Sequence, residues 1–160
     1  MRILAFDPGY ERLGAAVVEK VKGKDSLIFS DCVRTSAKLP FHERLSILGQ
    51  AAETLIQEWQ PDAMALEEVY FEKNAKTAMQ VAEVRGMLSY IAARAGLPLH
   101  QYTPAEVKVA VTGHGASDKR AVAMMVLRLL GLKALPAGRR GLDDELDAIA
   151  VGLTCLASVR

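Results

Sequence analysis

The chain begins with the run RILAFDPG, residues 2–9, in which a short apolar strand ends abruptly at an acid and a turn. Pro8 and Gly9, which follow Asp7 directly, are strong turn formers. A carboxylate at the end of a strand projects from rigid backbone into the crevice where open α/β sheets bind ligands. An Asx turn that only stabilises the bend is the alternative for Asp7, and this run alone does not decide between them.

Hydrophobic periodicity predicts the elements that follow. Two more strands are expected at residues 13–21 and 27–35, joined by a polar turn at 22–26, which together favour an antiparallel meander. A helix (43–59), a buried strand (63–66), a long helix (74–95) and a short strand (98–102) come next, and further helices begin near 104, 117 and 143. We therefore expect an α/β fold with a mixed five-stranded sheet flanked by helices, in one domain over residues 1–160.

Composition sets the broad class of protein. Of 160 residues, 51% are hydrophobic and 24% are charged, which is ordinary for a globular chain. No apolar run reaches the roughly 18 residues that a membrane span needs, and Asp7 comes too early for a signal peptide, so we expect a cytoplasmic protein without a membrane anchor. Cys32 and Cys155 lack metal-type spacing and are expected to be buried thiols.

Charge is distributed unevenly along the chain, although its net value is only +1. Residues 101–142 contain seven basic and two acidic residues, so this segment carries +5 and the rest of the chain carries −4. Such asymmetry suits a protein that meets a polyanion with one side. A solvated helix face with ordinary lysines explains the pattern equally well.

A second pair of acids ends the buried strand at 63–66. An ionised carboxylate at the edge of such a strand is costly unless it is solvated or binds a cation. Glu67 and Glu68 are both candidates, because a strand buried on both faces shows no polar alternation. The residues favour Glu67 only slightly.

A third group of acids lies at residues 143–147, in the first turn of the last predicted helix. The helix dipole favours acids there, and Asp143 is the expected N-cap. Asp144 and Asp147, however, are three residues apart and therefore share a face. Glu145, between them, is expected to add negative charge beside that face.

The three acid groups together indicate metal chemistry. Carboxylates are the preferred ligands of Mg²⁺ and Mn²⁺. Two such ions about 4 Å apart can activate water and stabilise the leaving oxygen of a phosphodiester. Since the chain has no phosphate-binding loop, GxSxG or HExxH motif, we predict metal-dependent hydrolysis, with Asp7, either Glu67 or Glu68, and the pair Asp144 and Asp147 as candidate metal ligands and catalytic residues.

The motifs, in this order and spacing, resemble the RuvC family of Holliday-junction resolvases, which have the ribonuclease H-like fold. The resemblance covers essentially the whole chain. It rests on ILAFDPG at 3–9, ALEEVY at 65–70, Lys73-Asn74-Ala75, Val107-Lys108, Gly113-His114-Gly115, Lys119, and DELDAIA at 144–150.

The resemblance implies roles for single residues. It selects Glu67 over Glu68, and Asp144 over Asp143. It places Tyr70 where the family keeps an aromatic residue that stacks at the open centre of the junction. Lys108, Lys119 and Arg120 become expected DNA-binding residues, the two lysines beside the scissile phosphate. Arg139 and Arg140 make the loop before the last acids more basic than the family pattern suggests.

The implied activity is a metal-dependent endonuclease that resolves Holliday junctions by paired symmetric nicks during recombination and repair. The family implies a homodimer, with the long helix from Asn74 as the dimer element, and a branch-migration helicase complex as a further partner. Two Mg²⁺ ions per site are expected, with Mn²⁺ as a substitute. The alternatives are another ribonuclease H-like nuclease, acting on flaps or RNA–DNA hybrids, and a non-catalytic junction-binding protein.

Overall fold

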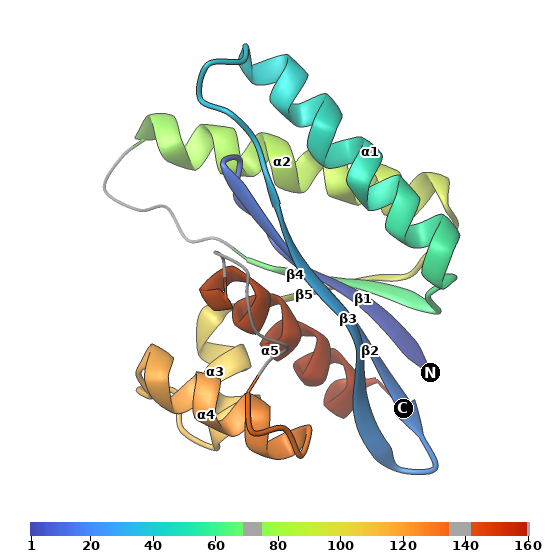
Figure 1. Cartoon of the computed structure of the whole chain (residues 1–160), viewed down its shortest axis with the longest axis vertical. Helices are drawn as coiled ribbons and strands as arrows, with labels where there is room; N and C mark the ends of the chain where they lie inside the picture. The colour runs from blue at the N-terminus through green and yellow to red at the C-terminus, as the bar shows by residue number, and fades with distance from the viewer. Residues whose placement is uncertain (69–74, 135–141, 160) are drawn as a thin grey trace.

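Strand β1 (Arg2–Asp7) lies at the centre of the sheet and pairs on both sides. It runs antiparallel to β2 (Arg12–Val21) and parallel to β4 (Ala63–Glu67), while β3 (Lys24–Arg34) and β5 (Leu99–Tyr102) form the edges. The order is β3-β2-β1-β4-β5 (Figure 1). This computed structural model describes residues 1–68, 75–134 and 142–159. The predicted mixed five-stranded α/β sheet is confirmed.

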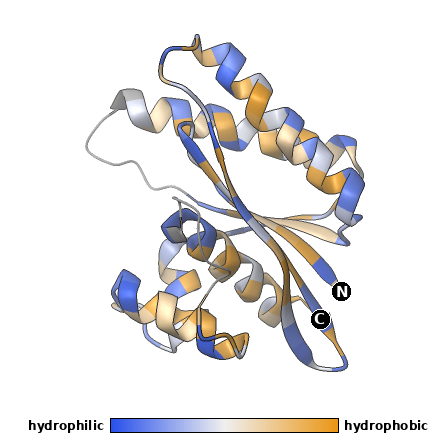
Figure 2. Ribbon diagram, in the orientation of Figure 1, coloured by the Kyte–Doolittle hydropathy of each residue, from blue (hydrophilic) through white to orange (hydrophobic). Residues whose placement is uncertain are grey.

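Helices cover both faces of the sheet (Figure 1). Helices α1 (Phe41–Trp59) and α2 (Ala75–Arg94) lie on one face, and α5 (Leu142–Ser158) lies on the other. Helices α3 (Pro104–Thr112) and α4 (Lys119–Leu129) pack against α5. Figure 2 shows apolar residues concentrated in the strands between the two helix layers. No helix in the described ranges is long and apolar enough to cross a membrane.

The two faces of the sheet carry side chains of different size. Toward α1 and α2 the central strands present large residues, such as Leu4, Phe6 and Leu66. Toward α5 they present small ones, such as Ala5 and Ala65. Because small side chains let a helix approach closely, α5 lies tight against the sheet. A Cβ added at Gly152 of α5 would lie 2.7 Å from Val18 Cγ2, so the helix requires glycine there.

Some predicted turns and caps differ from the structure. The β2–β3 turn contains only Lys22 and Gly23, with φ of 51° and 79°, instead of residues 22–26. Two positive φ values match the twist of a tight hairpin, and the strands extend further than predicted.

Helix caps fix where α3 and α4 begin. Thr103 forms a capping box with Glu106. Asp118 accepts a hydrogen bond from the backbone N–H of Ala121, so α4 begins at Lys119, slightly later than the expected start near 117. The predicted cap at Asp143 is wrong, because α5 already includes Leu142. The predicted burial of the thiols at Cys32 and Cys155 is confirmed.

Candidate metal centre

Asp7 and Glu67 are the last residues of two neighbouring parallel strands. The register pairs Phe6 with Leu66, so the two acids leave the sheet side by side at the same edge. Asp7 is in phase with Ile3 and Ala5, which face α5. Successive strand residues point to opposite faces.

The same alternation distinguishes Glu67 from Glu68. Glu67 is in phase with Ala63 and Ala65, which also face α5. Glu68 has the opposite phase, and its backbone N–H donates to Tyr102 O at 2.7 Å. The structure therefore brings Glu67, rather than Glu68, beside Asp7.

The turn after Asp7 is anchored by Arg44, a buried residue of α1. Arg44 Nη2 donates to Tyr10 O at 3.2 Å, and its Nε donates to Thr35 Oγ1 at 2.9 Å. The guanidinium also lies over the Tyr10 ring, 4.9 Å from its centroid. Burial is unusual for arginine unless its donors are paired, so these contacts fix the turn that follows the strand. Nothing in the sequence pattern marks Arg44.

Gly14 brings the third acid group to this edge. It pairs with Asp7 across the β1–β2 ladder. A Cβ at Gly14 would lie 2.1 Å from the backbone oxygen of Asp144, so only glycine lets the first turn of α5 sit there. The carboxylates of β1, β4 and α5 therefore meet through two strand registers and one close helix contact.

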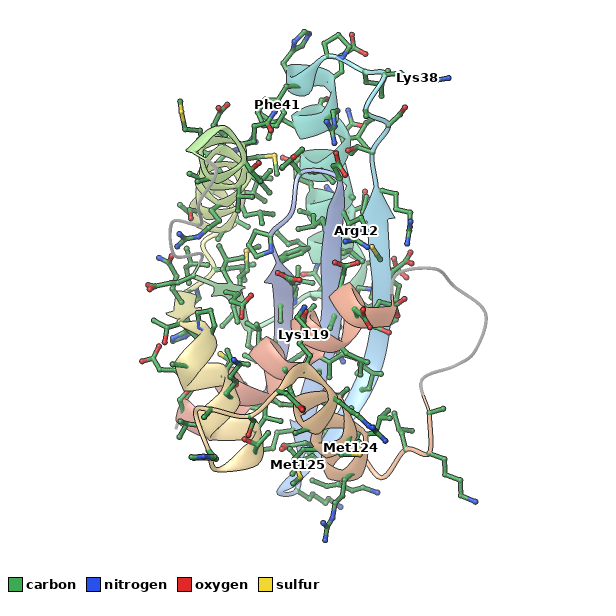
Figure 3. All side chains as sticks on the ribbon, turned by 90° about the vertical axis from the view of Figure 1, so that its left-hand side faces the viewer. Arg12, Lys38, Phe41, Lys119, Met124 and Met125 are labelled. Atoms are coloured by element: carbon green, nitrogen blue, oxygen red, sulfur yellow. The ribbon has the colours of Figure 1, made fainter. Side chains whose placement is uncertain are left out.

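Each of the two α5 acids contacts a basic side chain. Asp144 Oδ2 lies 3.5 Å from Arg12 Nε and accepts a hydrogen bond from the Cys32 thiol at 3.7 Å. Asp147 Oδ2 accepts from Lys119 Nζ at 3.0 Å. Figure 3 shows Arg12 and Lys119 on one side of the molecule, with α5 between them. Sequence patterns did not indicate these contacts, because that of Arg12 depends on how α5 packs over β2 and that of Cys32 also depends on the pairing of β2 with β3.

The strand acids carry strongly shifted pKa values. Burial, followed by the charges of Glu67, Asp147 and Asp144, raises the pKa of Asp7 to about 8. Burial and then the charge of Asp147 raise the pKa of Glu67 to about 6, although Lys119, a hydrogen bond with Asp7, and Lys108 act in the opposite direction. The charges of Asp144 and Asp147 act on Asp7, and that of Asp147 acts on Glu67, so the acids of β1, β4 and α5 lie near one another.

The donor set fits a hard divalent cation. All four groups are carboxylates, and the strand acids are unfavourable as anions unless a positive charge joins them. Burial and then Asp144 raise the pKa of Cys32 to about 11, so its sulfur remains a thiol and not a soft thiolate ligand. In the side-chain arrangement of residues 1–68, 75–134 and 142–159, no three His, Cys, Asp or Glu groups already enclose an ion position.

Two predicted DNA-binding lysines lie next to the acids. A pocket of about 360 Å³ is lined by Glu67 and Asp147 together with Lys108 and Lys119. The hydrogen bond to Asp147 raises the pKa of Lys119, which keeps its ammonium charged. Arg120 is exposed on α4 and does not line this pocket. Tyr70, Lys73, Asn74, Arg139 and Arg140 lie outside the described residues.

Glu145 was expected to add negative charge beside Asp144 and Asp147, but its side chain lies elsewhere. Its side chain is buried, and it accepts a hydrogen bond from Ser30 Oγ of β3 at 2.7 Å. It is therefore held in the contact between α5 and β3, instead of standing free beside Asp144 and Asp147.

Comparison with known proteins identifies the relatives of this chain. Residues 3–155 match the family described as "Crossover junction endodeoxyribonuclease RuvC". The chain belongs to the RuvC family. The RuvC of Thermosipho melanesiensis is 41% identical over 98% of this chain and 97% of its own length. That of Moorella thermoacetica is 42% identical, covering 99% and 92%.

Solved structures agree with this assignment. The structure titled "T. thermophilus RuvC in complex with Holliday junction substrate" superposes with a TM-score of 0.87 and 34% identity, covering 98% of this chain and 93% of the other. A yeast mitochondrial Holliday junction resolvase shares the fold, with a TM-score of 0.68 and 14% identity over 95% and 77% of the two chains. The predicted family, the ribonuclease H-like fold and the nuclease class are confirmed, and RuvC nucleases are metal-dependent.

Proposed function

We propose that this chain is a metal-dependent endonuclease that resolves Holliday junctions, with Asp7, Glu67, Asp144 and Asp147 as its metal-holding catalytic residues. One observation carries the proposal: Asp7 and Glu67 end neighbouring parallel strands, and the close contact at Gly14 brings Asp144 of α5 to the same edge of the sheet. Family membership supports the substrate, because relatives are named for cleavage of crossover junctions.

The four acids have separate tasks in this mechanism. Asp7 and Glu67 are fixed by strand pairing, so they would define where cations bind, and Asp7, with a pKa of about 8, would have to lose its proton to hold one. Asp144 and Asp147 complete the set from α5. Two bound Mg²⁺ ions, with Mn²⁺ as a substitute, would supply water activation and stabilisation of the leaving oxygen.

The basic residues act on the DNA. Lys108 and Lys119 line the pocket beside Glu67 and Asp147, where they can stabilise the negative charge that develops on the scissile phosphate. We assign Arg120, exposed on the same helix as Lys119, to the DNA backbone further away. Tyr70 is proposed to stack on a base at the junction centre, as the family resemblance implies.

We further propose that the chain, as one domain over residues 1–160, works as a homodimer. In α2, Val84, Leu88 and Ile91 are buried against the sheet, whereas Met79, Ala82, Gly86 and Tyr90 form an exposed stripe at helical spacing. A stripe of small and apolar residues suits helix pairing, and a twofold dimer matches the paired nicks that a junction needs. Its action on DNA in the cytoplasm, with junctions delivered by a branch-migration helicase, is proposed from the family relationship.

The dimer proposal is tested by the mass in solution. Light scattering after size-exclusion chromatography should give twice the mass of one chain, and Gly86→Arg should give single chains. A dimer that persists in Gly86→Arg would contradict α2 as the interface. Gly23→Arg, in the β2–β3 turn, provides a control for the added charge.

Substrate choice tests the proposed function itself. The full chain with Mg²⁺ is offered a synthetic four-way junction, a flapped duplex and an RNA–DNA hybrid, and the products are mapped. Paired nicks placed symmetrically across the junction are expected. Faster cleavage of the flap or the hybrid would favour another ribonuclease H-like nuclease, and junction binding without any product would favour a non-catalytic binding protein.

A further inference from the structure

Two side chains from the β2–β3 hairpin hold Asp144, and they differ in how freely they can move. Arg12 Nε lies 3.5 Å from Asp144 Oδ2, and the Arg12 side chain is 56% exposed. The Cys32 thiol donates to the same oxygen at 3.7 Å, but Cys32 is buried. The Asp144 side chain itself is 16% exposed.

Strand register places both groups beside Asp144. Gly14 pairs with Cys32, and Arg12 stands two residues before Gly14, so all three positions face α5. The Asp144 backbone lies directly over Gly14, where no side chain intervenes. Its carboxylate therefore has Arg12 beside it along β2 and Cys32 beside it across the ladder. This backbone arrangement brings the arginine to the acid.

We propose that Arg12 is a positioning residue that acts as an internal counter-cation of Asp144 and leaves it when a divalent cation binds, while Cys32 keeps the carboxylate oriented. The inference rests on the proposed function, in which Asp144 is a metal ligand. Arg12 and a metal ion are both cations that use the same carboxylate, so each weakens the binding of the other.

Exposure decides which of the two contacts is exchanged. Arg12 has a long side chain that is more than half exposed, so it can swing into solvent at little cost. Cys32 is a short, buried side chain of β3, so its hydrogen bond to Asp144 remains when Arg12 has left. Arg12 therefore opposes cation binding, whereas Cys32 favours it. The two substitutions should shift metal affinity in opposite directions.

The experiment measures Mn²⁺ binding to the full chain without DNA, from the loss of the electron paramagnetic resonance signal of free Mn²⁺. Arg12→Gln should tighten Mn²⁺ binding by roughly two- to fivefold, the range of an exposed ion pair, and Arg12→Lys should stay near wild type. Cys32→Ala should weaken binding by about twofold or more, because a thiol donor is lost, and Cys32→Ser should restore it.

Lys38→Gln provides the matched control. It removes one positive charge from the loop before α1, which Figure 3 shows well away from α5 on the same side of the molecule. Unchanged affinity is expected there. Thermal melting without metal should differ little between wild type and Arg12→Gln, since an exposed ion pair contributes little to stability.

The outcomes separate this inference from the function beneath it. Tighter binding in Arg12→Gln, with no change in Lys38→Gln, supports the exchange. If Asp7→Asn abolishes Mn²⁺ binding but Arg12→Gln binds as wild type or more weakly, the exchange is wrong and the metal site stands. If wild type shows no Mn²⁺ binding that depends on Asp7, the proposed metal function itself fails, and the exchange fails with it.

Discussion

Asp7 and Glu67 stand at the ends of two strands, whereas Asp144 and Asp147 stand on the first turns of α5. The strand pair is buried with few positive neighbours, and its pKa values rise to about 8 and about 6. The helix pair instead contacts Arg12 and Lys119. At neutral pH Asp7 therefore retains its proton, whereas Glu67 is mostly ionised beside Lys108 and Lys119. In the helix half, Asp144 and Asp147 are balanced by ion pairs.

This difference shows how four acids can share a site before a cation binds. Burying four anions together would cost more free energy than a domain can supply. The proton on Asp7 and the basic side chains beside the other three acids remove that cost. Both are exchangeable for divalent cations, so the arrangement is stable without metal and still able to bind it.

The close contact between Gly14 of β2 and Asp144 of α5 joins the strand half and the helix half of the site. We expect the largest effect when this contact is broken. Gly14→Ala would place a Cβ 2.1 Å from the Asp144 backbone oxygen, so α5 must shift away from β1. We expect a loss of about 3 kcal/mol in the free energy of unfolding, measured by urea denaturation, together with loss of junction cleavage. Gly115→Ala, where an added Cβ would lie 3.4 Å from Val109 Cγ2, an ordinary contact distance, is the control and should leave the free energy of unfolding nearly unchanged. A Gly14→Ala protein of wild-type stability would refute the close contact.

Protonation of the strand half gives the next effect. The pKa of Asp7 is about 8 in the folded chain against 3.8 as the ordinary value, so the folded state holds a proton that the unfolded state releases. Stability of the metal-free protein should therefore fall as pH rises from about 4 to about 8. Asp7→Asn escapes this loss and should exceed wild type by about 2 kcal/mol at pH 9, with a smaller gap at pH 4.5.

Urea denaturation in the presence of a chelator, across this pH range, measures the difference in the free energy of unfolding between wild type and Asp7→Asn. Added Mg²⁺ should narrow it for wild type only. A gap that stays constant with pH would mean that Asp7 is ionised in the metal-free fold.

The ion pairs of the helix half give the smallest effect. Lys119→Gln removes the partner of Asp147 and a positive charge from the pocket, so junction cleavage with Mg²⁺ should slow about tenfold. Arg120→Gln, the neighbouring control outside the pocket, should weaken junction binding with less effect on the cleavage of bound DNA. If the two substitutions slow cleavage equally, the proposed role of Lys119 at the scissile phosphate is wrong.

Much of the strand half of the site, Asp7 and Glu67, was predictable from the sequence. The apolar runs at 2–7 and 63–67 each end in an acid, and this pattern predicts carboxylates at the ends of two strands. The choice of Glu67 needed only one further signal. In the run 63–66 small and large residues alternate, and Glu67 continues the small phase that faces α5, as Asp7 does after Ala5. A search for alternating polar and apolar residues does not detect this pattern, because the residues on both faces of the strand are apolar.

The partners of the helix half could not be predicted, because they depend on register. A five-residue turn at 22–26 would have paired Gly14 with Arg34, whereas the two-residue turn at Lys22 and Gly23, together with the β-bulge between Val17 and Val18, pairs it with Cys32. Cys32 reaches Asp144 only in this observed register, and Arg12 reaches it because α5 lies close over Gly14 of the same strand. A small error in turn length is therefore enough to hide the contacts of a functional residue.

The central claim is that the strand half and the helix half form one metal-dependent nuclease site. Cleavage of a synthetic four-way junction by wild type and by Asp7→Asn, at equal protein concentration with Mg²⁺, tests it most directly. The two side chains have nearly the same shape, so the substitution removes the charge of the carboxylate and little else. We predict paired nicks with wild type and no product with Asp7→Asn, whose junction binding persists. Unchanged cleavage by Asp7→Asn would contradict the account.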